Sequence, residues 1–164
     1  MSKWEVKMRA VVQRVREATV TVEGCPTGRI GPGMVVLLGI GREDGEEAVN
    51  YLAEKLVALR IFDGAAPDSA REGRRVMDRS IAEIQGEVLL VSQFTLYGDC
   101  RRGRRPSFDE SAPPQTAQPL YRRFADRLRE LGFQPQEGVF GARMELYLVN
   151  DGPVTMLLDS ERRF

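Results

Sequence analysis

The chain has 164 residues, of which 42% are hydrophobic and 29% charged, the balance of one soluble, folded domain. Its 24 lysines and arginines equal its 24 aspartates and glutamates, which excludes attraction of nucleic acid by the overall charge. The absence of histidine excludes Ser-His-Asp and Cys-His triads and histidine-containing metal sites.

Period-two alternation, apolar runs and turn residues predict the early strands, in chain order: strand, turn and strand over residues 9–23, a turn at 24–28 and a buried strand at 34–40. Residues 1–7 form an expected N-terminal extension. Asp44 and Glu47 have capping-box spacing ahead of a helix that should reach about residue 60.

The second half of the chain has the following predicted elements: a loop at 64–75, a strand at 87–93, an extended loop at 106–117, a helix at 118–131, and strands at 144–149 and 154–159. Pro119 is expected in the first turn of its helix. Strands that do not alternate regularly with the two main helices predict an α+β fold, with a sheet or barrel-like sheet carrying helices on one side. The single domain should span residues 8–160, followed by a tail at 161–164.

Neither a metal nor a cofactor is expected. The two cysteines, Cys25 and Cys100, lack CxxC partners and are expected as free thiols, with a disulfide left open. No apolar stretch is long enough to span a membrane, and residues 1–7 lack the apolar segment of a signal peptide. We therefore expect a cytoplasmic protein.

Small polar residues end the strand predicted at 87–93. The candidate catalytic residues there are Ser92, Gln93, Phe94 and Thr95. Thr95 carries the most plausible hydroxyl nucleophile, but the chain has no histidine to act as its base. Orientation of water or substrate, with backbone N–H groups stabilising an oxyanion, therefore fits better than an acyl-enzyme. A strand end with one polar face is the alternative interpretation.

A Gly-Pro step lies between the last two predicted strands, in the segment Asn150-Asp151-Gly152-Pro153-Val154-Thr155. Glycine lets a ligand or another chain come close, whereas proline fixes φ and removes an N–H. Gly152 and Pro153 would together form a rigid backbone wall of a pocket, and a folded site can hold such a bond in the cis form. The alternative is an ordinary turn.

Two further segments suit RNA. One combines an aromatic ring, small residues and a thioether, which can hold a flat base or simply fill the core: Phe140, Gly141, Ala142 and Met144. The other places four arginines in five residues just after the first motif, where they can bind phosphates or form a solvated loop: Arg101, Arg102, Arg104 and Arg105.

These motifs resemble the D-aminoacyl-tRNA deacylases, the D-tyrosyl-tRNA deacylase family. The resemblance begins at Met8 and runs almost unbroken to Ser160, and it includes residues 30–33, 51–55, 59–62 and 102–108 besides the two motifs. The sequence departs from the family at Asp78, where asparagine is frequent, and in the composition of the loop before it.

The resemblance implies a hydrolase that cleaves the ester bond of D-aminoacyl-tRNA, and of glycyl-tRNA mischarged on tRNA-Ala, and so serves chiral proofreading in translation. It implies a homodimer in which a cis Gly152-Pro153 of one chain enters the active site of the other and rejects L-amino acids. The segment from Phe140 to Met144 would hold the terminal adenosine, whose 2′-hydroxyl takes part in the cleavage.

Two alternatives remain open. The related deacylases that edit L-alanine mischarged on tRNA depart from the sequence Ser-Gln-Phe-Thr, so residues 92–95 favour the D-specific type. A tRNA-binding module without catalysis would protect aminoacyl-tRNA instead of turning it over.

Overall fold

The computed structural model describes residues 8–64 and 76–163. The expected extension at residues 1–7 and nearly all of the loop expected at 64–75 lie outside these residues. The elements in chain order are β1 (Arg9–Val22), β2 (Cys25–Ile30), β3 (Gly33–Gly39), α1 (Glu46–Ala58), β4 (Glu87–Ser92), the 3₁₀ helix η1 (Phe94–Tyr97), α2 (Pro114–Glu130), β5 (Gln136–Glu137) and β6 (Glu145–Asp159).

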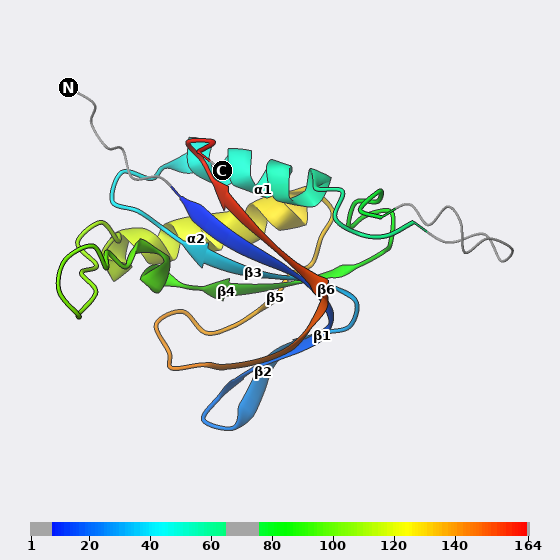
Figure 1. The fold of residues 1–164 in the computed structure, drawn as a ribbon, viewed down its shortest axis with the longest axis horizontal. Coiled ribbons are helices and arrows are strands. Elements are labelled where there is room, and N and C mark those ends of the chain that lie inside the picture. The colour runs from blue at the N-terminus through cyan, green and yellow to red at the C-terminus, as the bar shows by residue number, and fades with distance from the viewer. Residues whose placement is uncertain (1–7, 65–75, 164) are drawn as a thin grey trace, which may run out of the picture.

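A strongly curled sheet carries α1 and α2 side by side on one of its faces (Figure 1). The strand order is β2-β1-β3-β4-β5, and β6 pairs with β1. β1 is antiparallel to β2, β3 and β6, whereas β4 is parallel to both of its neighbours. Because β2 also contacts β5, the sheet approaches a barrel. The predicted α+β fold, with a barrel-like mixed sheet and two main helices, is confirmed.

Two apolar clusters fill the two faces of the sheet. Met34 and Val36 of β3 join the larger cluster, which packs beneath the helices, whereas Val35 joins a smaller cluster within the curl. This division follows from the alternation of side chains along a strand. Leu52 of α1 and Phe124 of α2 are fully buried in the larger cluster. The predicted buried strands at 34–40 and 87–93 are thus confirmed as β3 and β4.

The first strand is longer than predicted. Residues 9–22 form the single strand β1 and not strand, turn and strand. Arg14 and Val15 are both buried, and the pairing with β6 shifts register on both sides of Val15. A β-bulge therefore explains the break in the apolar alternation. The turn predicted at 24–28 is confined to Glu23 and Gly24, because β2 begins at Cys25.

The last two predicted strands are one strand, β6. Both of its halves pair with β1: Thr155 lies opposite Gln13, and Asn150 lies opposite Val15. Only Arg14 of β1 thus faces the residues between them, 151–154, which bulge out of the ladder. The Gly-Pro step is therefore not a turn between strands but a bulge that is held by pairing on both sides.

The helix starts also differ from the prediction. The N-cap of α1 is Gly45, and the Asp44 carboxylate instead accepts hydrogen bonds from the backbone N–H groups of Met8 and Gly41. α2 begins at Pro114 and not at residue 118, since a proline is well suited to the first helical position. Pro119 consequently lies inside the helix and not in its first turn. Among the described helices, none is long and apolar enough to cross a membrane.

Candidate active site

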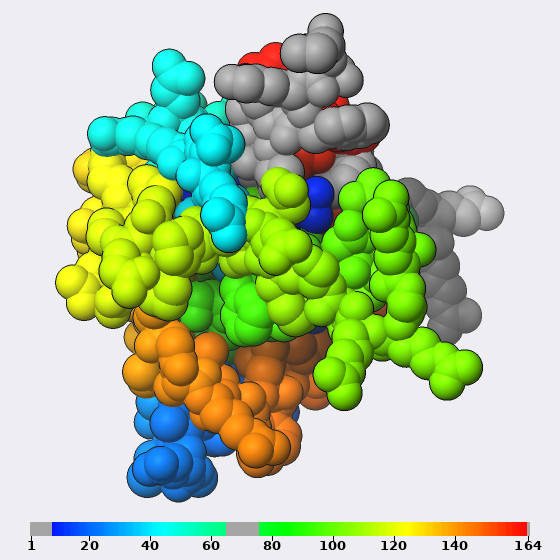
Figure 2. Space-filling model, turned by 90° about the vertical axis from the view of Figure 1, so that its left-hand side faces the viewer, coloured from blue at the N-terminus to red at the C-terminus, as the bar shows by residue number. Residues whose placement is uncertain are grey.

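A cavity of about 560 Å³ opens at the end of β4. Its walls come from four stretches that lie apart in the sequence: the end of β3, the end of β4 with the start of η1, the segment that leads into α2, and the segment that leads into β6. Figure 2 looks onto this side of the molecule, where the surface is recessed between the yellow-green segment before α2 and the orange segment before β6. The volume lies within the range of about 300–1,000 Å³ of small-ligand sites.

The cavity brings two of the predicted groups together. Those of their residues that line it are Ser92, Gln93, Phe94, Phe140, Gly141, Ala142 and Met144. Thr95 is exposed on η1, outside the lining, and its hydroxyl accepts a hydrogen bond from the side-chain amide of Gln93. The first motif and the proposed base-binding segment thus share one site, which is mostly apolar side chain and backbone.

The turn from β4 into η1 is held from several sides. The backbone N–H of Gln93 donates to the Leu38 carbonyl (2.8 Å), which places the end of β4 against β3. Arg9 of β1 donates from Nη1 to the Leu96 carbonyl (2.8 Å), and its guanidinium lies over the Tyr97 ring at 4.8 Å. Tyr97 is 3% exposed, and burial raises its pKa far above the ordinary value, so its phenol stays protonated.

The segment from Phe140 to Met144 is shaped by a turn. The Ala142 N–H donates to the Val139 carbonyl (3.1 Å), and Gly141 has φ +77°, a conformation that favours glycine. The Val139 N–H donates to the Met144 sulfur (3.3 Å). Phe140 pairs with the Tyr121 ring of α2, with 5.7 Å between the ring centroids. The segment therefore presents a ring and backbone groups to the cavity from a fixed loop.

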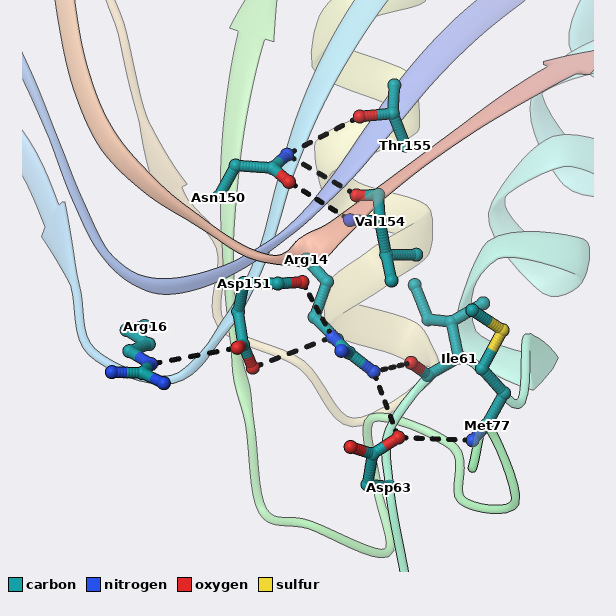
Figure 3. A network of polar contacts seen from close by, with 9 residues as sticks. All are labelled: Arg14, Arg16, Ile61, Asp63, Met77, Asn150, Asp151, Val154 and Thr155. Atoms are coloured by element: carbon teal, nitrogen blue, oxygen red, sulfur yellow. Dashed lines mark hydrogen bonds and ion pairs between the residues drawn. The ribbon is translucent and has the colours of Figure 1, made fainter. Parts of the chain in front are cut away.

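The Gly152–Pro153 peptide bond of the bulge is cis. The Asn150 side chain of β6 links the residues on either side of it (Figure 3). The Asn150 carboxamide oxygen accepts from the Val154 N–H (3.0 Å), and its Nδ2 donates to the Val154 carbonyl and the Thr155 hydroxyl, both at 3.4 Å. One amide thus bridges the two ends of the bulge.

Arg14 of β1 also holds the bulge, through hydrogen bonds. This role was not predicted from the sequence. Arg14 is 6% exposed, and it donates from Nε to the Asp151 carbonyl (3.0 Å) and from Nη1 to the Ile61 carbonyl (2.8 Å) and the Asp63 carboxylate (3.2 Å). A Cβ at Gly152, which has φ +123°, would lie 2.8 Å from Arg14 Nη2, so the contact requires glycine. The sequence signal was a charged residue within a buried strand pattern.

Within one chain, the bulge lies apart from the cavity. Gly152 and Pro153 are exposed and are not part of its lining. Three apolar side chains of the same strand are also exposed, with relative exposures of 59% for Tyr147, 46% for Val149 and 53% for Leu157. One chain therefore leaves both the bulge and an apolar face of β6 open.

The arginine-rich segment forms the tip of a hairpin. Asp99 and Ser107 exchange backbone hydrogen bonds of 2.8 and 3.0 Å at its base. Arg101 is bound to the Asp99 carboxylate through its guanidinium (2.8 and 2.9 Å), which holds the pKa of Asp99 well below its usual range. The other three arginines of the run are exposed and make no ion pair with a described residue: Arg102, Arg104 and Arg105.

Comparison with solved structures confirms the fold. A structure titled c-Myc DNA unwinding element binding protein superposes with a TM-score of 0.83 at 37% identity, and covers 93% of this chain and 98% of that chain. A probable eukaryotic D-amino acid tRNA deacylase superposes with a TM-score of 0.80 at 20% identity, over 94% of this chain and 100% of that chain, and so shares the fold. The curled sheet with its two helices is therefore the deacylase fold.

Sequence comparison gives the family. The D-Tyr-tRNA(Tyr) deacylase family matches residues 11–159. The chain is 59% identical to the D-aminoacyl-tRNA deacylase of Symbiobacterium thermophilum, over 96% of this chain and 99% of that protein. It is 52% identical to the D-aminoacyl-tRNA deacylase of Thermosipho africanus, over 96% of this chain and all of that protein. The chain belongs to this family of hydrolases, as the resemblance predicted.

Proposed function

We propose that the chain hydrolyses the ester bond of D-aminoacyl-tRNA and releases free D-amino acid and tRNA. The observation that carries the proposal is the shared cavity, in which the end of β4 meets the segment from Phe140 to Met144. An aromatic ring, small residues and a thioether suit the terminal adenosine, which would bring its aminoacyl ester beside Ser92, Gln93 and Phe94.

The chemistry falls mainly to backbone groups and the substrate. The chain has no histidine to activate a hydroxyl, and the Thr95 hydroxyl accepts a hydrogen bond from the side-chain amide of Gln93, which cannot take its proton. Water adds to the ester carbonyl, backbone N–H groups near η1 stabilise the oxyanion, and the ester oxygen leaves as a ribose hydroxyl. The 2′-hydroxyl of the adenosine assists this step.

The Gly-Pro bulge is the proposed chiral filter, supplied by a second copy of the chain. It is exposed outside its own cavity, it lies on a strand with an exposed apolar face, and Arg14 and Asn150 hold it in one shape. A two-fold homodimer would bury the apolar face of β6 in each protomer and place Gly152-Pro153 of each protomer in the cavity of its partner. The wall then excludes the side chain of an L-amino acid.

Four further properties complete the proposal. Glycine has no side chain for the wall to exclude, so glycyl-tRNA mischarged on tRNA-Ala is also a substrate. Removal of D-amino acids and misplaced glycine makes the protein a proofreading enzyme of translation, and its location is the cytoplasm. Arg102, Arg104 and Arg105 bind tRNA phosphates at the hairpin tip, while Arg101 mainly holds Asp99.

The decisive experiment compares matched D- and L-aminoacyl-tRNA and follows loss of the ester. We expect cleavage of the D form, with each tenfold of selectivity corresponding to about 1.4 kcal/mol. Equal rates of ester loss on the two enantiomers would refute the chiral filter. Protection of both esters would indicate a binding module, and preferred cleavage of L-alanyl-tRNA would indicate the alanine-editing type.

A mixing experiment tests the shared site. One protomer carries a replaced Pro153, and the other carries changes at Phe140 and Met144 that disrupt the cavity. A heterodimer of the two contains one intact composite site and one doubly damaged site. Partial recovery of D-selective activity on mixing supports sharing across the interface, whereas a fully active monomer at high dilution contradicts it.

A further inference from the structure

A second aromatic pair lies at the cavity, apart from Phe140. The rings of Phe94 and Phe108 meet edge to face, with centroids 5.0 Å apart and an interplanar angle of 68°. Both residues line the cavity, yet Phe94 is 58% exposed and Phe108 36% exposed. An edge-to-face contact covers one face of one ring, so other ring faces remain available for stacking.

Chain connectivity joins this pair to the arginines. Phe94 begins η1, just before the hairpin, and Phe108 directly follows Ser107 at the hairpin base. The exposed arginines at residues 102, 104 and 105 thus project from the same structural unit that carries both rings. The rings that line the cavity and the exposed arginines are thus carried by one short stretch of chain.

We propose that the Phe94–Phe108 pair is a subsite for the base of the nucleotide that precedes the terminal adenosine. The proposal rests on the proposed function, which puts the adenosine against Phe140. The RNA strand must leave the cavity next to that adenosine, and aromatic rings beside a basic segment are the usual surface for single-stranded bases and their phosphates. The base stacks on the Phe pair, and the phosphates beyond it meet the hairpin arginines.

The charge around the pair selects this occupant over an apolar protein surface. Three exposed arginines without ion pairs to described residues would be costly to bury against a protein face, whereas a polyanion neutralises them. The aminoacyl side chain is the other group that could reach the rings. If the nucleobase occupies the pair, a change at Phe108 alters RNA binding; if the aminoacyl side chain occupies it, the change alters the preference among amino acids.

The test measures binding of a short single-stranded RNA that ends in cytidine-cytidine-adenosine, by fluorescence anisotropy. A second RNA is abasic at the nucleotide before the terminal adenosine. Each RNA is titrated against the parent protein, Phe108→Leu and Phe108→Tyr. Stacking of one base corresponds to roughly five- to 150-fold in affinity, so we expect the abasic RNA to bind the parent about tenfold or more weakly.

The coupling between the two changes identifies the subsite. In Phe108→Leu, loss of the base should lower RNA affinity by about threefold or less. In Phe108→Tyr, which keeps a ring, loss of the base should again lower the affinity as it does in the parent protein. A purely structural role of Phe108 weakens both RNAs alike and leaves the base effect intact, which overturns the proposal. Should Phe108→Leu not fold, the comparison of the two RNAs on the parent protein still decides: equal affinities refute the subsite.

Failure of the proposed function is visible separately. The binding titrations use RNA without an amino acid, whereas the proposed function is read from ester loss on D-aminoacyl-tRNA. A parent protein that senses the base but does not cleave the ester retains the subsite and loses the proposed function. A parent protein that cleaves the ester but binds both RNAs equally retains the proposed function and loses the subsite. A Phe108→Leu protein that changes only the preference among D-amino acid side chains assigns the pair to the aminoacyl group and refutes the nucleobase subsite.

Discussion

Replacement of Arg14 by methionine should both destabilise the fold and relax the choice between D- and L-aminoacyl esters. Methionine retains an unbranched stem but removes the guanidinium that donates to the carbonyls of Ile61 and Asp151 and to the Asp63 carboxylate. Arg14 is the β1 residue opposite the bulge at residues 151–154. Arg16 of the same strand approaches Asp151 only at 3.6 Å from a largely exposed side chain, so it replaces the Arg14 contact poorly.

The magnitude follows from burial. The Arg14 side chain is 8% exposed and that of Asp63 is 18% exposed, so water replaces the lost contacts only in part. Removal of one partner of a buried ion pair costs about 3–5 kcal/mol, and the partial exposure of Asp63 places this case near the lower value, about 3 kcal/mol. A domain with about 5–15 kcal/mol of total stability tolerates this loss and remains folded.

Urea unfolding measures the stability change, and ester loss from matched D- and L-aminoacyl-tRNA measures selectivity. We expect the D/L rate ratio to fall by at least tenfold, about 1.4 kcal/mol, since the bulge loses its support. Arg16→Met is the matched control. Arg16 is 76% exposed and approaches the same Asp151 at 3.6 Å, so its loss should change stability by less than about 0.5 kcal/mol and leave the ratio unchanged. An Arg14→Met protein as stable and as selective as Arg16→Met would refute the reasoning.

Three other predictions concern the site and its rim. Thr95→Ala should keep appreciable deacylation activity, because the chain has no histidine to activate the hydroxyl; mass-spectrometric detection of an acyl-Thr95 adduct would contradict this. Gly141→Ala should cost about 1–2 kcal/mol in urea unfolding, because its φ of +77° is unfavourable for an L-residue, and a neutral effect would show that the turn relaxes. Joint replacement of Arg102 and Arg104 by alanine should lower the slope of log affinity against log salt by roughly 0.7–0.9 for each lost phosphate contact. Arg101→Ala should lower it less, since Arg101 is bound to Asp99, and an unaltered slope in the double variant would make the hairpin a solvated loop.

The sequence was sufficient wherever the signal is local. The apolar runs at 34–40 and 87–93 predicted β3 and β4. Apolar residues at helical spacing, Leu52 and Leu56 in α1 and Phe124 and Leu128 in α2, predicted the two helices. Both signals are local, because the spacing of apolar side chains along an element depends on which of its faces is buried. The motifs at residues 92–96 and 150–155 were specific enough to indicate the family, which the match over residues 11–159 confirms.

Only the tertiary structure decided whether a break in the pattern is a turn or a bulge. The interruption near Val15 was predicted as a turn, and the Gly152-Pro153 step as a break between two strands that forms a backbone wall or, alternatively, an ordinary turn. β1 and β6 nevertheless pair on both sides of each interruption and remain continuous. The same polar and glycine-containing sequence serves either role, and the outcome depends on a partner strand far away in the chain.

Arg14 shows the same limit at the level of one side chain. The sequence marks it as a charged residue in a buried strand, but its acceptors lie 47, 49 and 137 positions away in the chain. The cavity likewise exists only because β4 and the segment before β6 are brought together by the curl of the sheet. Residue types and local periodicity thus determine the elements and the motifs, whereas long-range pairing determines which groups meet, since a contact depends on both chain segments at once.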